Sequence, residues 1–303
     1  MSPRWISGTD VARLLPMGEA VDAIEDALRR GLDPAADPPR DVVGVAHGQV
    51  LLMPSAAGDR VGVKVATVTP GNPSRGLPRV QATYLLLDAL THAPLALLDG
   101  VAVTSLRTPA VSAVAARHLA RPDTSRLVVF GTGPQAAGHV EALRAIRPIA
   151  EVVVVGRDPD RTRAFAESVG GTVGTPGDVA RADVVVCATT ALEPLFDGRL
   201  VPDGGCVIAV GSHEPHVREL DSGLMGRATV VVEDPATALR EAGDVILAVS
   251  EDALTPGALI ALADLVAARS QPAPTRPRVF KSVGMAWQDL VVATELARRA
   301  SPA

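Results

Sequence analysis

The sequence predicts an α/β protein that contains a parallel sheet and, before it, a region of different texture. Between about residues 127 and 233, short unbroken apolar runs alternate with helical patterns, which is typical of a parallel sheet covered on both faces. Between about residues 42 and 98, β-type runs are separated by Gly, Pro and Asn clusters, which indicates an antiparallel sheet with hairpins. A chain of 303 residues is long enough for two such domains.

The composition restricts the class of protein. Apolar residues make up 47% of the chain and aromatic residues only 2%, so the cores consist mainly of Ala, Val and Leu. The net charge of −5 and the scattered basic residues exclude a nucleic-acid binder and favour small-molecule chemistry. No apolar run approaches the roughly eighteen residues of a membrane span, and the first residues lack a secretory signal. Cys187 and Cys206 are expected to be buried thiols of a reducing compartment, which predicts a cytoplasmic protein.

The first part of the chain starts with helices and continues as a sheet. Asp10 is expected to cap a short helix, and residues 17–30 carry apolar side chains at the spacing of one helical face. Residues 104–120 return to a helix with Arg107 at its start, and residues 121–123 mark a domain boundary. Strands are expected at 42–46, 49–53, 61–68, 80–89 and 94–99.

The second part alternates between strands and helices. Helices are expected from Pro134 to about residue 147 and over residues 159–169. The proline-rich residues 271–277 form a linker, and the strand and helix that follow it are expected to return to the first domain. Apolar strands are expected at 127–130, 152–155, 184–188, 206–210 and 229–233.

The stretch Gly131-Thr132-Gly133-Pro134-Gln135-Ala136 fits the pattern G-x-G-x-x-A between a strand and a helix. Gly131 permits the tight turn, Gly133 lets a pyrophosphate approach the backbone, and the small Ala136 lets the helix pack on the strand. Pro134 suits the first turn of a helix. This pattern predicts a Rossmann dinucleotide-binding domain.

The second strand of this domain ends at Gly156 and Arg157, where NAD-binding domains usually place an acidic side chain for the ribose hydroxyls. Asp158 is expected to cap the following helix instead. Arg157, helped by Arg161, can pair with a 2′-phosphate through its guanidinium group. We therefore predict NADPH as the cofactor, with NADH less favoured.

Several stretches together resemble the ornithine cyclodeaminase/μ-crystallin family, and they occur in the family's order. The resemblance implies a Rossmann domain at residues 123–277 and a discontinuous α+β substrate-binding and dimerisation domain at residues 1–122 and 278–303. It also implies a homodimer. Family members include cyclodeaminases, alanine dehydrogenases and ketimine or other imine reductases, and μ-crystallin also binds thyroid hormone. The matching stretches are PPR at 38–40, LLMPS at 51–55, VGVKVATVTPGNPSRGLP at 61–78, LLDGVAVTSLRTPAVSAVAARHLARPD at 97–123, GTGPQA, and VFKSVGMAWQDL at 279–290.

By the same resemblance, Arg40, Lys64 and Arg107 fall on positions that hold the substrate and the reactive end of the cofactor. Alternation along the strand places Lys64 on the face of the small residues Gly62 and Ala66. Arg107 lies at the start of its expected helix, where a cation opposes the helix dipole, so a purely structural role is disfavoured. Convergent cations of this kind bind a carboxylate.

The resemblance also assigns residues to the cofactor. It places Pro134 and Gln135 at the pyrophosphate turn and Thr189 in the loop after the strand 184–188. At the nicotinamide end it places Ser282 and Val283, of which Val283 is also expected to contact substrate. The cofactor-binding set is Arg107, Gly131, Gly133, Pro134, Gln135, Ala136, Arg157, Thr189, Val210, Gly211 and Ser282.

The stretch VGSHEPHVREL at 210–220 concentrates His and Glu residues, but its His pair lies in a loop and lacks the fixed spacing of H-E-x-x-H, so no metal is expected. Glu219 and Leu220 are expected to be structural. His213 takes the place of a family aspartate, while Leu51 and Arg79 replace a glutamate and a threonine of the cyclodeaminases. These departures disfavour ornithine cyclisation.

The hypothesis is therefore an enzyme, an NADPH-dependent reductase of a small carboxylate-bearing imine, either a cyclic ketimine or an α-imino acid. Lys64 or His213 would protonate or polarise the imine nitrogen, because histidine exchanges protons near neutral pH. Two alternatives remain open. One is an amino-acid dehydrogenase or cyclodeaminase that uses NAD, and the other is a non-catalytic NADPH-binding protein.

Overall fold

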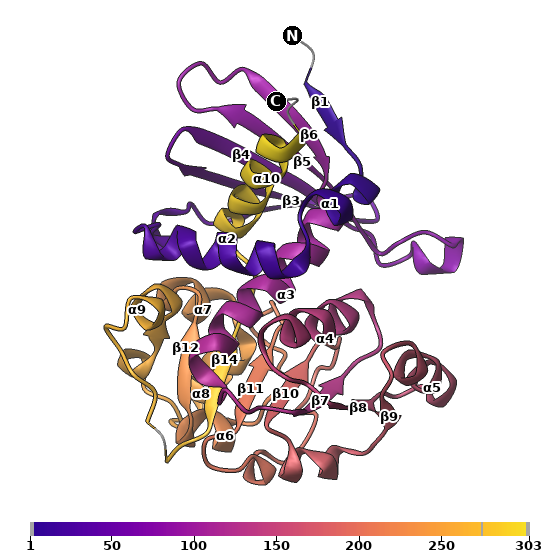
Figure 1. The fold of residues 1–303 in the computed structure, drawn as a ribbon, viewed down its shortest axis with the longest axis vertical. Coiled ribbons are helices and arrows are strands. Elements are labelled where there is room, and N and C mark those ends of the chain that lie inside the picture. Colours follow the sequence, from indigo (N-terminus) through magenta and orange to yellow (C-terminus); the bar gives the residue numbers. More distant parts are fainter. Residues whose placement is uncertain (1–2, 274, 301–303) are drawn as a thin grey trace. The chain divides into compact units, whose positions relative to one another are not determined.

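The computed structural model describes residues 3–273 and 275–300. The chain forms two compact units, the first from residues 1–108 and 285–303 and the second from residues 109–284 (Figure 1). The sequence predicts domain boundaries at 122/123 and 277/278. The observed boundary at 108/109 falls inside a helix, α3 (Gly100–Leu119), where no composition change marks it.

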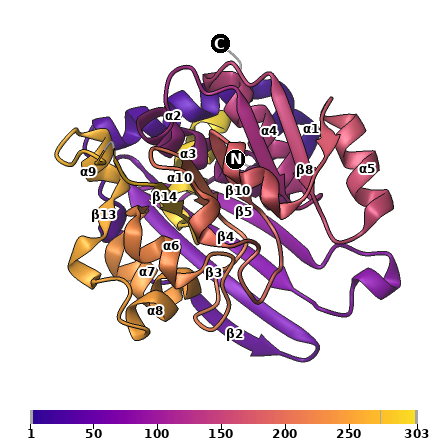
Figure 2. The same ribbon diagram turned by 90° about the horizontal axis from the view of Figure 1, so that it is seen from below.

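The first unit contains a six-stranded sheet in the order β1-β6-β5-β4-β3-β2. Neighbouring strands are antiparallel, except that β1 runs parallel to β6. The predicted hairpins are thus present. Figure 2 shows β2 to β5 side by side. The strands are β1 (Arg4–Ile6), β2 (Asp41–Val45), β3 (Gly48–Ala57), β4 (Arg60–Val68), β5 (Val80–Asp88) and β6 (Pro94–Asp99).

Three helices belong to this unit: α1 (Gly8–Leu14), α2 (Met17–Arg29) and α10 (Ala286–Ala300). The C-terminal helix α10 lies on one face of the sheet, against β3, β4 and β5, and also contacts α2 (Figure 1). The expected return of the tail is confirmed for this helix. At the start of α1 the N-cap is Ser7 and not Asp10, because Asp10 is the third residue of the helix and completes a capping box with Ser7.

The second unit is a doubly wound domain built on an eight-stranded sheet in the order β13-β12-β14-β11-β10-β7-β8-β9. All of its neighbouring strands are parallel. The strands are β7 (Arg126–Phe130), β8 (Glu151–Val155), β9 (Thr172–Val173), β10 (Val184–Cys187), β11 (Cys206–Ala209), β12 (Thr229–Val232), β13 (Ile260–Ala261) and β14 (Arg278–Lys281). The order reverses at β7, so the loops after β7 and β10 flank the position where such sheets bind ligands.

The strand β14 corrects the predicted domain division. It pairs with β11 through Ile208 and Phe280 and with β12 through Val231 and Phe280, so residues 278–284 belong to the second unit. The sequence assigned them to the first domain because they follow the linker. The two apolar residues of β14, Val279 and Phe280, are completely buried there, because a strand inside a parallel sheet is covered on both faces.

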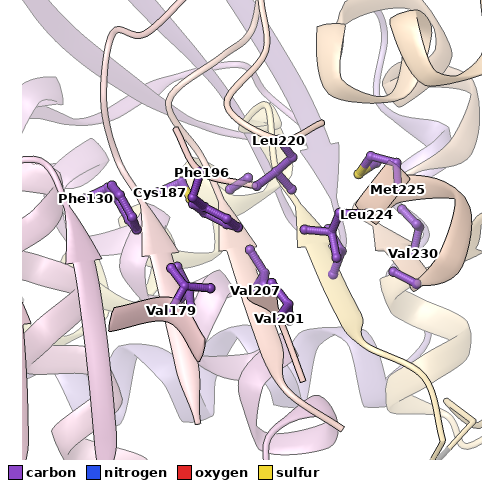
Figure 3. Packing of buried hydrophobic residues seen from close by; sticks show 14 of the residues in the cluster. Phe130, Val179, Cys187, Phe196, Val201, Val207, Leu220, Leu224, Met225 and Val230 are labelled. Atoms are coloured by element: carbon purple, nitrogen blue, oxygen red, sulfur yellow. The ribbon is translucent and has the colours of Figure 1, made fainter. Parts of the chain in front are cut away.

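The remaining helices are α4 (Pro134–Ile146), α5 (Pro159–Ser168), α6 (Ser222–Arg227), α7 (Pro235–Glu241), α8 (Gly243–Ser250) and α9 (Leu262–Val266), and short 3₁₀ turns lie at Pro34–Ala36, Pro73–Arg75, Pro176–Arg181, Gly198–Leu200 and Pro256–Ala258. One face of the second sheet carries a core built mainly of Val, Ala and Leu with two contacting rings, Phe130 and Phe196 (Figure 3). Among the described residues, none of the helices is both long and apolar enough to cross a membrane.

Candidate functional site

The fingerprint loop connects β7 to α4 in the second unit. Gly131 has a φ of +112°, and a Cβ at this position would lie 2.4 Å from the carbonyl oxygen of Ala188. Only glycine fits there, because both the backbone conformation and the neighbouring loop exclude a side chain. The loop after β7 and the loop after β10 therefore come together at the reversal of strand order.

The start of α4 has the features of a dinucleotide site. Gly133 is the N-cap of α4, and a Cβ on it would meet no atom within 4 Å, so there is open space beside its Cα. The buried Oε1 of Gln135 has no hydrogen-bond partner among the described residues. Ala136 is fully buried under the strand, as predicted. An open glycine and a helix N-terminus fit the pyrophosphate of a dinucleotide, whose oxygens accept hydrogen bonds from backbone N–H groups.

A buried carboxylate, Glu219, ties together two loops that the sequence assigned to the cofactor. Its Oε1 accepts hydrogen bonds from the backbone N of Thr189 at 2.9 Å and from Thr189 Oγ1 at 2.7 Å, and its Oε2 accepts from the backbone N of Gly211 at 2.8 Å. A Cβ on Gly211 would lie 2.1 Å from the carbonyl oxygen of Thr189. The half-buried Val210 precedes this contact. Glu219 has a structural role, as predicted, and the two loops that it positions border the candidate cofactor site.

A second buried carboxylate, Glu233, holds the loop that follows β14. It accepts hydrogen bonds from Ser282 Oγ and from the backbone N of Val283, both at 2.8 Å, and from the backbone N of Gly284 at 3.2 Å. Ser282 is 1% exposed, so its hydroxyl is committed to Glu233. The loop that the resemblance places at the nicotinamide end is therefore held by its own backbone and by one carboxylate.

The segment after β8 confirms the predicted helix cap at Asp158. Asp158 is the N-cap of α5, and its Oδ1 accepts hydrogen bonds from the backbone N of Asp160 and of Arg161. Arg157 and Arg161 are exposed. The carboxylate next to the strand is therefore used as a helix cap.

In the first unit, Lys64 and Arg107 converge on a residue that the sequence analysis did not single out, Asp289. Lys64 Nζ lies 2.8 Å from Asp289 Oδ2, and Arg107 Nε lies 3.3 Å from Asp289 Oδ1. Lys64 Nζ also donates to Thr104 Oγ1 at 3.3 Å, and Arg107 Nη1 donates to Gln288 Oε1 at 2.7 Å. Lys64 and Arg107 are 3% and 5% exposed, and Asp289 is completely buried.

The electrostatics of Lys64 suit proton exchange. Burial lowers the pKa of Lys64 to about 8, the charge of Asp289 opposes this shift, and the charges of Arg107 and Arg40 add to it. Arg40, which is half-buried, is therefore near enough for its charge to act on Lys64, and its predicted role in substrate binding stays a prediction. The predicted strand face is confirmed, since Gly62, Lys64 and Ala66 are buried.

One argument about Arg107 was wrong. The helix α3 begins at Gly100, where the Asp99 side chain accepts hydrogen bonds from the backbone N of Val101 and of Ala102. Arg107 is thus two turns inside the helix and does not oppose the dipole at its start. Its buried contact with Asp289 is the observation that argues for a functional role.

His213 follows β11 in the second unit and is exposed. The neighbouring His216 Nε2 lies 3.4 Å from Glu214 Oε2, and both side chains are largely exposed. This pair has the character of a surface contact. His213 belongs to the second unit and Lys64 to the first, so the role of either residue in proton transfer stays a prediction.

Three buried carboxylates, Glu219, Glu233 and Asp289, were missed as site residues. A sequence signal existed for two of them, because Glu233 directly follows an apolar strand and Asp289 lies inside the stretch VFKSVGMAWQDL. Their partners lie far away along the chain, as with Lys64 and Asp289, so no local pattern reveals the contact.

Comparisons with known proteins match nearly the whole chain. The sequence model of the ornithine cyclodeaminase/mu-crystallin family matches residues 4–302. A Δ1-pyrroline-2-carboxylate reductase of Bacillus cereus is 34% identical over 312 residues, which cover 97% of this chain and 96% of the relative. The solved Δ1-pyrroline-2-carboxylate reductase of Thermococcus litoralis, in complex with NADH and L-proline, superposes with a TM-score of 0.90 at 31% identity over 98% of this chain and 97% of that one. An archaeal alanine dehydrogenase dimer with bound NAD gives a TM-score of 0.92 at 29% identity over 99% and 96%.

Proposed function

Because the chain belongs to the ornithine cyclodeaminase/mu-crystallin family, we propose that it is an NAD(P)-dependent oxidoreductase that reduces a small carboxylate-bearing imine to an amino acid. The observation that carries this proposal is the buried pair Lys64 and Arg107, which share the carboxylate of Asp289. Two cations on one anion leave a net positive charge away from water, and a substrate carboxylate neutralises it. The likeness to the Δ1-pyrroline-2-carboxylate reductases supports a cyclic imine.

The residues of the chain have two tasks in this reaction. Arg40 and Arg107 bind the substrate carboxylate through charge-assisted hydrogen bonds. Lys64 or His213 gives a proton to the imine nitrogen. A dinucleotide held at the fingerprint loop of Gly131 and Gly133 would supply the hydride for the imine carbon, and this hydride and the proton together would convert C=N to CH–NH. In the reverse direction the same groups oxidise an α-amino acid.

Lys64 and His213 can be separated as proton donors by their pH profiles. A group with a pKa of about 8, such as Lys64, keeps its proton throughout the neutral range. If His213 is the donor, His213→Ala lowers kcat and removes a limb of its pH profile. An unchanged rate and profile in His213→Ala assign the step to Lys64, provided that Lys64→Met abolishes turnover while retaining cofactor binding.

The apolar wall beside Lys64 supports an imine substrate over a diamine. Leu51 is buried on the face of the sheet that carries Lys64, because Leu51 pairs with Ala66 and Met53 pairs with Lys64. A second amino group on the substrate would therefore meet a leucine instead of a carboxylate. Ornithine cyclisation is disfavoured, and amino-acid dehydrogenation remains the second candidate because the archaeal alanine dehydrogenase has a similar structure.

NADPH is the cofactor we propose over NADH. The support is the pair Arg157 and Arg161 at the end of β8, together with the use of Asp158 as a helix cap. An anionic 2′-phosphate fits guanidinium groups better than the ribose hydroxyls of NADH do.

A homodimer is also proposed, and the outer face of the first sheet supports it. This face is apolar and not covered by α10, with Val43 48% and Val65 39% exposed. Its residues include Val43, Val50, Leu52, Val63, Val65, Leu85 and Leu97. Light scattering should give twice the mass of 31.2 kDa, and Val65→Glu should reduce it to that of the monomer, whereas Val173→Glu on β9 should not.

The location of the protein stays a prediction. Cys187 and Cys206 are buried free thiols, and burial raises the pKa of each. Unreactive buried thiols of this kind suit a reducing compartment such as the cytoplasm.

The test of the proposed function is an NADPH-oxidation screen. The panel contains Δ1-pyrroline-2-carboxylate, Δ1-piperideine-2-carboxylate, and 2-oxo acids mixed with ammonia or methylamine. We expect turnover of at least one cyclic imine, and loss of this turnover in Lys64→Met with unchanged NADPH binding. Tight NADPH binding without oxidation of any substrate would instead identify a non-catalytic binding protein, and turnover of acyclic mixtures alone would identify an amino-acid dehydrogenase.

A further inference from the structure

The basic residues of this chain are distributed unusually. Of its 29 lysine and arginine residues only two are lysines, Lys64 and Lys281. Both are almost completely buried, at 3% and 1% exposure, so among the lysine and arginine side chains of the described residues only arginines lie on the surface. Arginine stays charged at any physiological pH, whereas a buried lysine can release its proton. Lys64, whose pKa burial lowers to about 8, is therefore a cation that can release its proton near neutral pH.

The two lysines have different partners. Lys281 pairs with Asp244 at 3.0 Å and donates to the carbonyl oxygen of Ser212 at 2.6 Å, which is a structural contact within the second unit. Lys64 shares its carboxylate, because Asp289 also binds Arg107. The charge of Asp289 is thus divided between two cations, and its position decides both the geometry and the protonation of Lys64.

The position of Asp289 is itself fixed by the start of α10. Asp289 lies in the first turn of this helix, and the backbone N of Trp287 in the same turn donates to Asp37 Oδ2 at 2.6 Å. Asp37 Oδ1 in turn accepts from Ser55 Oγ at 2.6 Å. The helix start is therefore anchored to the loop before β2 and to β3, independently of the two cations.

We propose that Asp289 is a positioning residue that fixes Lys64 and Arg107 in the orientation that receives the substrate carboxylate and holds the proton on Lys64 at neutral pH. The proposal rests on the proposed function, because it states that Asp289 sets the pH range in which the substrate carboxylate binds.

All charged and titratable groups that face Lys64 are consistent with this role. The helix α3 contributes Arg107, and the loop before β2 contributes Arg40, whose charges both favour loss of the proton from Lys64. The strand β5 places Tyr84 opposite Lys64, and burial and the charges of Asp289 and Asp37 raise the pKa of Tyr84, so it stays neutral. Asp289 is the group that opposes burial and both arginines.

The two-lysine composition provides a direct test. Protein labelled selectively with ¹³C-lysine gives two side-chain Cε signals by NMR, and Lys64→Arg assigns them. In Asp289→Asn, which has nearly the same shape, we expect the titration of Lys64 to move to lower pH, and the second lysine signal serves as the internal reference. Glu295→Gln on the same helix, which pairs with Arg298 and Arg299, should leave the titration of Lys64 unchanged.

The kinetic counterpart uses the imine that the screen identifies. We expect Asp289→Asn to raise KM about tenfold at neutral pH through loss of charge-assisted contacts. The rise of KM at alkaline pH should begin at a lower pH than in the wild type, and NADPH binding should be unchanged. If Asp289→Asn does not fold, Lys64→Arg provides the test. Arginine keeps its charge at alkaline pH, so Lys64→Arg should remove the rise of KM at alkaline pH. An unchanged Lys64 titration in folded Asp289→Asn overturns the inference. If the titration of Lys64 shifts in Asp289→Asn but the protein reduces no imine, the coupling between Asp289 and Lys64 is upheld and the proposed function is rejected.

Discussion

Lys281 Nζ lies 3.0 Å from Asp244 Oδ2, and both side chains are withdrawn from solvent. Asp244 Oδ1 also accepts hydrogen bonds from the backbone N of Glu219 and of Leu220, at 2.8 and 2.9 Å. The pair therefore connects the end of β14 to α8 and fixes the segment that carries Glu219. Through Glu219, the contact reaches the loops of Thr189 and Gly211.

Breaking this ion pair should destabilise the protein. Lys281→Met leaves Asp244 charged and buried without its cation, and we expect the free energy of unfolding in urea to fall by about 3–5 kcal/mol. Arg269→Ala removes an exposed pair with Asp264 and should leave the urea midpoint within experimental error. Equal effects of the two substitutions would show that burial does not strengthen the pair.

Glu219→Gln should weaken cofactor binding. The amide can replace only one of the two carboxylate oxygens, so the backbone N of Thr189 or that of Gly211 faces an NH₂ group. We expect the Kd for NADPH, measured by fluorescence titration, to rise about tenfold. Glu251→Gln, which loses an exposed pair with Arg218, is the control. If both variants bind alike, the loops do not depend on Glu219.

Arg157→Ala should change the choice of cofactor. If Arg157 binds the 2′-phosphate, its removal raises the Kd for NADPH by about 10- to 100-fold through loss of one charge-assisted contact and leaves the Kd for NADH unchanged. Arg163→Ala on the same helix, where Arg163 pairs with Asp160, should affect neither. A parallel loss of both cofactors in Arg157→Ala contradicts the proposed preference.

Asp37→Asn should alter the pH dependence of stability. Burial, with a contribution from Asp289, raises the pKa of Asp37 from 3.8 to about 6. Its stabilising contribution is thus fully present below pH 3.8 and is lost as the pH rises through about 6. The asparagine keeps an acceptor for Trp287 and cannot ionise, so Asp37→Asn should gain stability relative to the wild type across this range. Urea unfolding between pH 4 and 8 checks this, and a difference independent of pH contradicts it.

Gly62→Ala tests the packing behind Lys64. A Cβ on Gly62 would lie 2.0 Å from Tyr84 Oη, which is completely buried. We expect a loss of about 1–3 kcal/mol in the free energy of unfolding, because the ring has to move in a filled core. Gly44→Ala in β2 adds a Cβ in open space and should cause no comparable loss.

Much of the fold is visible in local patterns. The alternation of strands such as 127–130 with helices such as 134–146 predicts the parallel sheet, and Gly131 and Gly133 locate the turn after its first strand. The face of β4 that carries Lys64 also follows from alternation alone. These features depend on residues within a few positions of one another, so the sequence shows them directly.

The domain boundaries and the carboxylates of the site needed the tertiary structure. The boundary inside α3 has no local marker, and β14 joins the second sheet because its apolar side chains fill the gap between β11 and β12. Asp289 meets Lys64 across 225 positions of sequence, and Glu219 meets Thr189 across 30. The sequence by itself determined the family and the dinucleotide fold, and it pointed to Lys64 and Arg107 as candidate site residues. Only the tertiary structure decided which buried anions position them, because a buried charge takes its partner from whatever the fold packs against it.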